Sequence, residues 1–196
     1  MPAESEFLEH KKISLRKLSK AKDKGLVDKG IIPILNLLNN FDDYYTTSSC
    51  YGRIVLLEIP EIGDKKNATF LGKWHRKIKS EEVLKTAKKA NKGLLWILAQ
   101  SPIIHIRAKT KNAADKMLKT AISSGFKNSG LKSINKDYVI EIASTERLDS
   151  PIGKDGTLFC DDKHLNLLVE IANDIIYKSS LKIKKFEKIL TKSIIK

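Results

Sequence analysis

His105 and Arg107 are the residues of this chain whose types and spacing most directly suggest chemistry. They lie two positions apart in residues 103–109, an isoleucine-rich stretch that predicts a β-strand. Successive strand residues point to opposite faces, so both side chains share one face while Ile104 and Ile106 fill the other. A general base for neutral pH, or an anion-orienting pair, would be built this way. The commoner alternative is a structural histidine held by hydrogen bonds.

A second polar cluster lies at residues 46–53, with the sequence TTSSCYGR. It combines four hydroxyls, the thiol of Cys50, a flexible glycine and Arg53. Its donors, Ser49 among them, could hold a carboxylate or phosphate, and Arg53 would make a bidentate contact that lysine cannot mimic. The structural alternative, which the residues alone favour slightly, is an edge strand that binds no ligand. Cys50 is not expected to act as a nucleophile, because no neighbour in the sequence would activate its thiol.

The glycines do not form a known nucleotide-binding loop. Residues 125–133, GFKNSGLKS, nearly match a P-loop, but Leu131 stands where that motif needs lysine and Lys132 comes one position late. No GxGxxG occurs in the sequence, so a Rossmann loop has no support. A polar turn remains at residues 126–130, and its amide and hydroxyl donors could face a ligand.

The four histidines and two cysteines do not form a metal-binding pattern. Cys160 and His164 would offer only two of the ligands that zinc needs. Cys50 and Cys160 are far apart without a CxxC motif, so neither a disulfide framework nor a zinc cage is expected. The longest apolar run is far shorter than the ~20 residues of a membrane span, and no signal peptide is visible. We expect a cytoplasmic protein with no membrane segment and no bound metal.

The formal net charge is +14, from 37 Lys and Arg against 23 Asp and Glu. This charge is segregated along the chain. Residues 65–92 carry +8, 107–136 carry +7 and 178–196 carry +6, whereas 30–64 and 137–177 carry −4 and −6. Basic blocks of this kind bind polyanions such as nucleic acid through counterion release. They equally suit lysine-covered helices that only keep a protein in solution.

Hydrophobic periodicity and turn residues predict helices and strands that alternate irregularly. The expected helices are at 6–23, from Asp28, at 80–91, at 110–124 and from Asp162, and the expected strands are at 44–48, 53–60, 70–78, 94–100, 103–109 and 138–144. This pattern predicts an α+β fold rather than a Rossmann methyltransferase.

Three boundaries follow from turn residues and helix breakers. Strands 44–48 and 53–60 are expected to meet at a turn beside Gly52, and the segment around Pro151 to be a loop. Ser179 and Ser180 are expected to interrupt the last helix. The predicted organisation is therefore a single mixed domain at 1–178 followed by a basic amphipathic helix or tail at 179–196. Trp96, within an apolar run, is expected in the core.

Several motifs, in order along the chain, resemble one protein family. They are YTTSSCYGRI at 45–54, Trp74-His75, PIIH at 102–105, SGFKNSG at 124–130, and ASTERL at 143–148. In these motifs the chain is similar to the wybutosine-synthesis methyltransferases of archaea and eukaryotes. Members of that family modify the hypermodified guanosine beside the anticodon of phenylalanine tRNA.

The resemblance implies transfer of a methyl group from S-adenosylmethionine to the N-4 ring nitrogen of that tricyclic base. It implies three groups of site residues: for the cofactor, Ser49, Cys50, Arg53, Asn128, Ser129 and Gly130; for accepting a proton, His105 or His75; and for tRNA, Arg107, Lys127 and Arg147. Tyr51 and Lys127 depart from the family pattern, in which a small residue and an arginine are usual. These departures leave open which wyosine derivative is the substrate.

Two other function classes stay open on the sequence. A non-catalytic basic RNA-binding protein would have the same composition, and the missing glycine fingerprint suits it. A zinc protein is a more distant alternative. Binding of S-adenosylmethionine distinguishes an enzyme from an RNA-binding protein, and metal analysis tests the third class.

Overall fold

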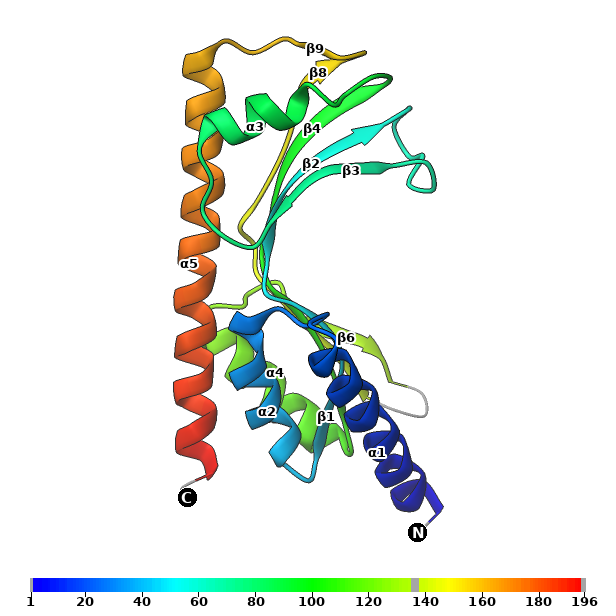
Figure 1. Cartoon of the computed structure of the whole chain (residues 1–196). Coiled ribbons are helices and arrows are strands. Elements are labelled where there is room, and N and C mark those ends of the chain that lie inside the picture. Colours follow the sequence, from blue (N-terminus) through cyan, green and yellow to red (C-terminus); the bar gives the residue numbers. More distant parts are fainter. Residues whose placement is uncertain (1, 135–137, 195–196) are drawn as a thin grey trace. The chain divides into compact units, whose positions relative to one another are not determined.

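The computed structural model describes residues 2–134 and 138–194. Its helices are α1 (Pro2–Asp23), η1 (Lys29–Ile31), α2 (Ile32–Asn40), α3 (Ser80–Ala87), α4 (Lys111–Ser123) and α5 (Asp162–Ile194). Its strands are β1 (Tyr44–Cys50), β2 (Arg53–Ile59), β3 (Thr69–Trp74), β4 (Leu94–Gln100), β5 (Ile103–Ala108), β6 (Gly130–Ser133), β7 (Tyr138–Ala143), β8 (Arg147–Lys154) and β9 (Thr157–Leu158). Figure 1 shows these elements. None of the described helices is both long enough and apolar enough to cross a membrane.

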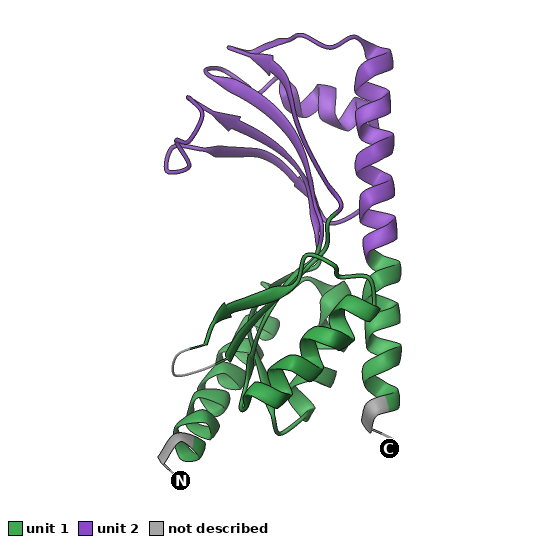
Figure 2. Cartoon of the chain, turned by 180° about the vertical axis from the view of Figure 1, so that it is seen from behind, with its two compact units in different colours: residues 1–51, 102–145, 180–196 green, residues 52–101, 146–179 purple. Residues whose placement is uncertain are grey.

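The chain forms two compact units, coloured separately in Figure 2. The first consists of residues 1–51, 102–145 and 180–196, and the second of residues 52–101 and 146–179. Each unit has its own sheet, with strand order β1-β5-β7-β6 in the first and β3-β2-β4-β8-β9 in the second. All the described strand pairs are antiparallel, which confirms an α+β fold and is incompatible with a parallel Rossmann sheet.

The first sheet buries one face against helices. Ile104 and Ile106 of β5 and Ile140 of β7 are fully buried and pack with α2, α4 and the last part of α5. The ring of Phe126 meets that of Phe186 on α5 edge to face, with centroids 5.7 Å apart. Thr110 begins α4 as expected, because its side chain accepts a hydrogen bond from the Ala113 amide. The isoleucine face predicted for residues 103–109 is thus confirmed.

The second sheet also has one face against helices of its own unit. Ile54, Leu56 and Ile97 are fully buried and pack with α3 and with the first part of α5. Alternate residues of the same strands point the other way. Trp96 lies on that opposite face and is only partly buried, so its predicted place in the core is wrong. Its indole nitrogen is the one buried side-chain polar atom of the described residues that lacks a hydrogen-bond partner.

The predicted turn between strands 44–48 and 53–60 does not join neighbouring strands. β1 pairs with β5 in the first sheet, whereas β2 pairs with β3 and β4 in the second. The chain changes sheets at Gly52, which has φ +95°, a conformation that favours glycine. It changes back between β4 and β5, at Pro102. The alternation of apolar and polar residues identifies a strand and its two faces, but it does not identify the strands that pair with it.

The predicted loop around Pro151 is wrong, because those residues form β8, which pairs with β4. Proline cannot donate to a sheet ladder, so it is confined to edges and irregularities. Pro151 lies at an irregularity, because the β4–β8 register shifts beside it. It also lies on an edge, because β9 pairs only with Gly153 and Lys154 of β8 and leaves Pro151 without a neighbour on that side. The end of the polar turn at 126–130 is likewise a strand, since β6 begins at Gly130.

The expected interruption of the last helix at Ser179 and Ser180 is wrong. α5 runs without a break from Asp162 to Ile194. Serine inside a helix costs only about half a kcal/mol relative to alanine, too little to end a helix with a long apolar stripe. Ser179 is 2% exposed, and its hydroxyl lies 3.5 Å from that of Ser101. The compact units are interleaved along the chain and differ from the predicted division into 1–178 and 179–196.

Candidate functional site

A row of polar residues crosses the first sheet on the face opposite its isoleucine core. Strand register places Ser48 of β1 opposite His105 of β5, His105 opposite Glu141 of β7, and Glu141 opposite Gly130 of β6. Directly opposite residues on antiparallel strands share a face. The row therefore crosses four strands, of which β1, β5 and β7 are far apart in the sequence.

Hydrogen bonds connect this row from end to end. Ser48 Oγ lies 2.8 Å from His105 Nδ1, and His105 Nε2 lies 2.9 Å from Glu141 Oε2. The other carboxylate oxygen of Glu141 is 2.7 Å from Lys132 Nζ. Ser48 is exposed, while the His105 and Glu141 side chains retain 28% and 19% exposure. We name these three residues, Ser48, His105 and Glu141, the polar row.

The charge on Glu141 determines the direction of these hydrogen bonds. Lys132 first, and His105 after it, lower the pKa of the Glu141 carboxyl below its usual value. The carboxylate is thus ionised at neutral pH and can only accept, so a neutral His105 carries its proton on Nε2. Nδ1 then accepts the hydrogen bond from the Ser48 hydroxyl. The row leads from an exposed hydroxyl, through an imidazole, to a carboxylate.

A bulge in β1 brings Ser48 into the polar row. The β1–β5 register shifts between Thr46 and Ser48, so these two residues face opposite sides of the sheet despite being two positions apart. Asn39 anchors the strand just before the bulge. Its amide donates to Thr46 Oγ1 at 2.9 Å, and its carbonyl accepts from the Thr46 amide, also at 2.9 Å. Asn39 and Thr46 are both buried.

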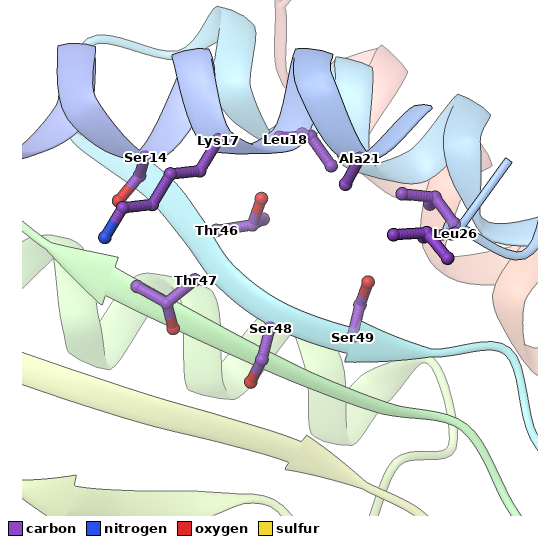
Figure 3. Close-up of a pocket in the computed structure, with 10 residues that line it drawn as sticks. Ser14, Lys17, Leu18, Ala21, Leu26, Thr46, Thr47, Ser48 and Ser49 are labelled. Carbon is purple, nitrogen blue, oxygen red and sulfur yellow. The ribbon is translucent and has the colours of Figure 1, made fainter. Parts of the chain in front are cut away.

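A pocket of about 300 Å³ lies between α1 and β1, within the first unit (Figure 3). In Figure 3 the hydroxyls of Thr46 and Ser49 point toward α1, whereas those of Thr47 and Ser48 point away from it. Lys17 adds a cation to the lining, and Leu18 and Leu26 add apolar surface. Residues 46–49 all line this pocket, and Ser48 in addition contributes its hydroxyl to the polar row.

Cys50 and the turn at residues 126–130, both predicted to bind the cofactor, lie at the same end of the first sheet. Cys50 is opposite Ile103, which is opposite Ala143. The Asn128 amide donates to the Ala143 carbonyl at 3.2 Å, and Ser129 Oγ accepts from the Ala143 amide at 3.1 Å. With strands ~4.8 Å apart, Cys50 is two strand spacings, about 10 Å, from Ala143, and the turn lies one spacing further, beyond β7.

Within this turn the predicted residues have different environments. The Ser129 hydroxyl donates to the Phe126 carbonyl at 2.7 Å and is held by the local backbone. Asn128 and Lys127 are exposed. A Cβ placed on Gly130 would meet no atom within 4 Å, so the space above it is open. Asn128 and Gly130 are accessible to a ligand, and Ser129 mainly shapes the turn.

Three predicted residues, Arg53, His75 and Arg147, belong to the second unit. Arg53 is opposite Gln100, which is opposite Arg147, and Arg53 Nε donates to Gln100 Oε1 at 2.8 Å. Arg147 forms an ion pair with Asp149. His75 Nδ1 lies 2.9 Å from the Gly52 carbonyl and must donate to it, so His75 would accept a proton at Nε2.

Arg107, predicted to contact tRNA, lines a pocket of about 230 Å³ on the first unit. His10 and Lys17 of α1 line the same pocket, together with Thr47. These groups provide positive charge and a hydroxyl, a donor set suited to phosphate.

Cys160, one of the residues considered for zinc, has the environment of a packed thiol. Burial raises its pKa, which disfavours the thiolate that zinc requires. Its sulfur lies 3.8 Å from the Ile152 carbonyl.

Ser48, Glu141 and Lys132 were not among the residues predicted from the sequence. Alternation along β7 assigns Glu141 to the correct face, so its place beside His105 follows once the pairing of β7 with β5 is known. Ser48 could not be predicted in this way, because regular alternation from Tyr44 assigns Ser48 to the wrong face of the sheet.

Comparisons with known proteins agree on one family. A family model described as "Methyltransferase TYW3" matches residues 9–192. A curated relative from Thermococcus sibiricus is 46% identical over 185 residues, 94% of each chain. One from Pyrococcus horikoshii is 48% identical over 182 residues, 92% of this chain and 93% of the relative. Both are named tRNA(Phe) 7-((3-amino-3-carboxypropyl)-4-demethylwyosine(37)-N(4))-methyltransferase, the second with the suffix 1.

Two solved structures share the fold of this chain. A protein from Pyrococcus horikoshii matches with a TM-score of 0.92 and 46% identity, covering 97% of this chain and 98% of that one. A protein from Aeropyrum pernix matches with a TM-score of 0.73 and 30% identity, covering 83% and 96%. These matches confirm the resemblance found in the sequence motifs. The chain belongs to the TYW3 methyltransferase family.

Proposed function

We propose that this protein methylates the N-4 nitrogen of the tricyclic wyosine-type base at position 37 of tRNA(Phe), with S-adenosylmethionine as the methyl donor. The observation that carries this proposal is the near-complete alignment with relatives named for that reaction, at 46% and 48% identity. The +14 charge suits a tRNA substrate. We place the reaction in the cytoplasm, where tRNA is found.

The residues at the end of the first sheet fit S-adenosylmethionine chemically. The cofactor has a carboxylate and ribose hydroxyls, which need donors, and a cationic sulfonium, which favours a nearby carboxylate. Ser49, Cys50 and Asn128 supply polar groups, and the open space at Gly130 admits a ligand. Glu141 supplies the carboxylate in the next row of the sheet. Bound there, the cofactor would supply an electrophilic methyl group.

The polar row provides a route for the proton released by the reaction. The substrate nitrogen forms a bond to carbon, the carbon–sulfur bond breaks with its electron pair kept by sulfur, and the nitrogen loses its proton. Ser48 Oγ accepts that proton as its own moves to His105 Nδ1, and Glu141 stabilises the resulting imidazolium. His105 therefore acts as the base through Ser48. His75, in the second unit, is the alternative base.

Cationic side chains on each unit are proposed to hold the tRNA backbone. On the first unit these are Arg107, in its pocket with Lys17, and Lys127, exposed in the turn. On the second unit it is Arg147, whose side chain is 73% exposed although it pairs with Asp149. Arg53 stays a proposed cofactor contact, and its guanidinium is already oriented by Gln100.

The test is methyl transfer to tRNA(Phe) isolated from cells that lack this methyltransferase step. The purified protein is incubated with that tRNA and with S-adenosylmethionine carrying a labelled methyl group. Nucleoside mass spectrometry should find one added, labelled methyl group on the tricyclic base. If the protein binds this tRNA but calorimetry finds no binding of S-adenosylmethionine, the protein is a non-catalytic RNA-binding protein and the proposal is wrong.

A further inference from the structure

The second unit has a sheet face that none of its own described helices covers. α3 and α5 both pack on the face that contains Ile54, Leu56 and Ile97, and Figure 2 shows both helices on the same side of the sheet. The opposite face carries Leu57, Trp96 and Leu98, each partly exposed. We call this second surface the open face. It offers apolar area flanked by charge.

An aromatic ring held between two cations lies on the open face. Phe70 of β3 is opposite Leu57, and Lys73 is opposite Val55, so both side chains share this face. Phe70 is 50% exposed. Lys73 Nζ lies 4.7 Å and Arg53 Cζ 5.7 Å from the centre of its ring. Both distances are within the range of cation–π attraction, so the cations fix the position of an exposed ring.

Positive charge extends from this ring across the sheet. Arg53, Gln100 and Arg147 form one row in register on the open face. The turn between β2 and β3 adds no net charge, because Glu61 and Asp64 balance Lys65 and Lys66. Asp149 is the one acidic residue at the described register positions of this face, and it pairs with Arg147.

We propose that the open face binds unpaired nucleotides of the substrate RNA, with a base stacked on Phe70 and phosphates held by Lys73 and its cationic neighbours. An exposed aromatic ring on a basic sheet matches single-stranded RNA, which offers flat base faces and phosphates together. Duplex RNA hides its base faces and would gain only the charge. An acidic peptide lacks flat bases, and an anionic membrane would need a larger apolar surface. The inference rests on the proposed function, because that function makes RNA the partner.

Tyr177 offers a matched control in the same unit. It is also 50% exposed, and Lys77 lies 5.0 Å from the centre of its ring. It belongs to α5, which packs on the covered face of the sheet. Tyr177→Leu therefore removes an equally exposed ring, in contact with one cation, from a different surface.

The experiment measures binding of a fluorescein-labelled tRNA(Phe) anticodon stem–loop by fluorescence anisotropy, and of the same stem closed as a full duplex. Phe70→Leu should weaken stem–loop binding between about 5-fold and 100-fold and leave duplex binding almost unchanged. Phe70→Tyr and Tyr177→Leu should bind like the wild type. Lys73→Gln should reduce the salt dependence of log Kd by roughly 0.7, and Lys77→Gln should not.

Unchanged stem–loop binding by Phe70→Leu overturns the inference. So does an equal loss of stem–loop and duplex binding, or an equal effect of Tyr177→Leu. Competition by polyglutamate or anionic vesicles that is weaker for Phe70→Leu than for wild type assigns the face to those partners instead. Methyl transfer separates this result from the proposed function: Phe70→Leu should raise the KM for tRNA in proportion to its loss of affinity, whereas Tyr177→Leu should react like the wild type. A wild-type protein that transfers no methyl group contradicts the function and leaves the RNA-binding result intact.

Discussion

His105 and Glu141 face each other on adjacent strands of the first sheet, with Nε2 and Oε2 2.9 Å apart. This pair orients the imidazole so that Nδ1 meets the hydroxyl of Ser48, 2.8 Å away. A histidine held by a carboxylate on one side and a hydroxyl on the other is built to accept a proton. Both ring nitrogens of His105 are therefore engaged, while its side chain keeps 28% exposure.

Replacing His105 should slow chemistry without weakening cofactor binding. His105→Ala removes the proton acceptor, so the single-turnover rate of methyl transfer should fall about 10²- to 10⁴-fold. The affinity for S-adenosylmethionine, measured by calorimetry, should stay within about twofold of wild type. His164→Ala, an exposed histidine on α5, is the control and should react normally. A normal single-turnover rate in His105→Ala would transfer the role of base to His75.

Neutralising Glu141 should affect both the reaction and the acid stability of the protein. Glu141→Gln no longer stabilises an imidazolium at His105, so the single-turnover rate should fall at least about tenfold. Because Lys132 and His105 lower the pKa of Glu141, its charge favours the folded state above the ordinary value of 4.5. That contribution disappears as the pH falls below this value.

The corresponding measurement is urea unfolding of wild type and Glu141→Gln between neutral pH and about pH 3. The wild type should lose more stability than the variant on acidification. Equal losses would contradict the ion pair with Lys132.

Tyr44 should make stability sensitive to alkaline pH. Burial first, and the charge of Asp43 second, raise the pKa of Tyr44 from 10.0 to about 12. Its hydroxyl donates to the Ala113 carbonyl at 2.9 Å. A raised pKa means that the stabilisation is complete below pH 10 and is lost as the pH approaches 12. In thermal unfolding over this range, Tyr44→Phe should show a smaller fall in Tm than wild type; parallel curves would exclude this role.

Asn39 should act on the reaction through the position of β1. Asn39→Ala removes two hydrogen bonds to buried Thr46 and should destabilise the fold by about 1–3 kcal/mol. It should also lower the methyl-transfer rate, because the bulge that aims Ser48 at His105 loses its anchor. Exposed Asn40→Ala is the matched control. A destabilised Asn39→Ala that reacts at the wild-type rate would show that the bulge forms without this anchor.

The sequence predicted well which face of the first sheet each side chain occupies. It predicted poorly which strands pair with each other. The alternation of Ile104 and Ile106 with His105 and Arg107 was confirmed residue by residue, because one face of β5 is buried. β8 was missed because Pro151 and the nearby Gly153 are residue types typical of loops, although an edge strand tolerates both. The changes of sheet at Gly52 and Pro102 depend on long-range pairing, which alternation does not encode.

The candidate site shows the same division. His105 was predictable because its spacing from Arg107 is local, and the motif ends at Cys50 and Asn128 were recognisable as polar turns. Glu141 lies 36 positions from His105, and only the β5–β7 register joins them. Ser48 was hidden by a one-residue bulge, which reverses the face that regular alternation assigns.

The most direct test of the proposed proton route is a double-mutant cycle between Ser48 and His105 in single-turnover methyl transfer. If the proton passes from Ser48 to His105, either Ser48→Ala or His105→Ala breaks the route, and the double variant should be no slower than the slower single variant. Ser123→Ala, which removes an exposed hydroxyl from α4, should keep the wild-type rate. Rate losses of Ser48→Ala and His105→Ala that multiply in the double variant would show that the two residues act independently, and would contradict the route.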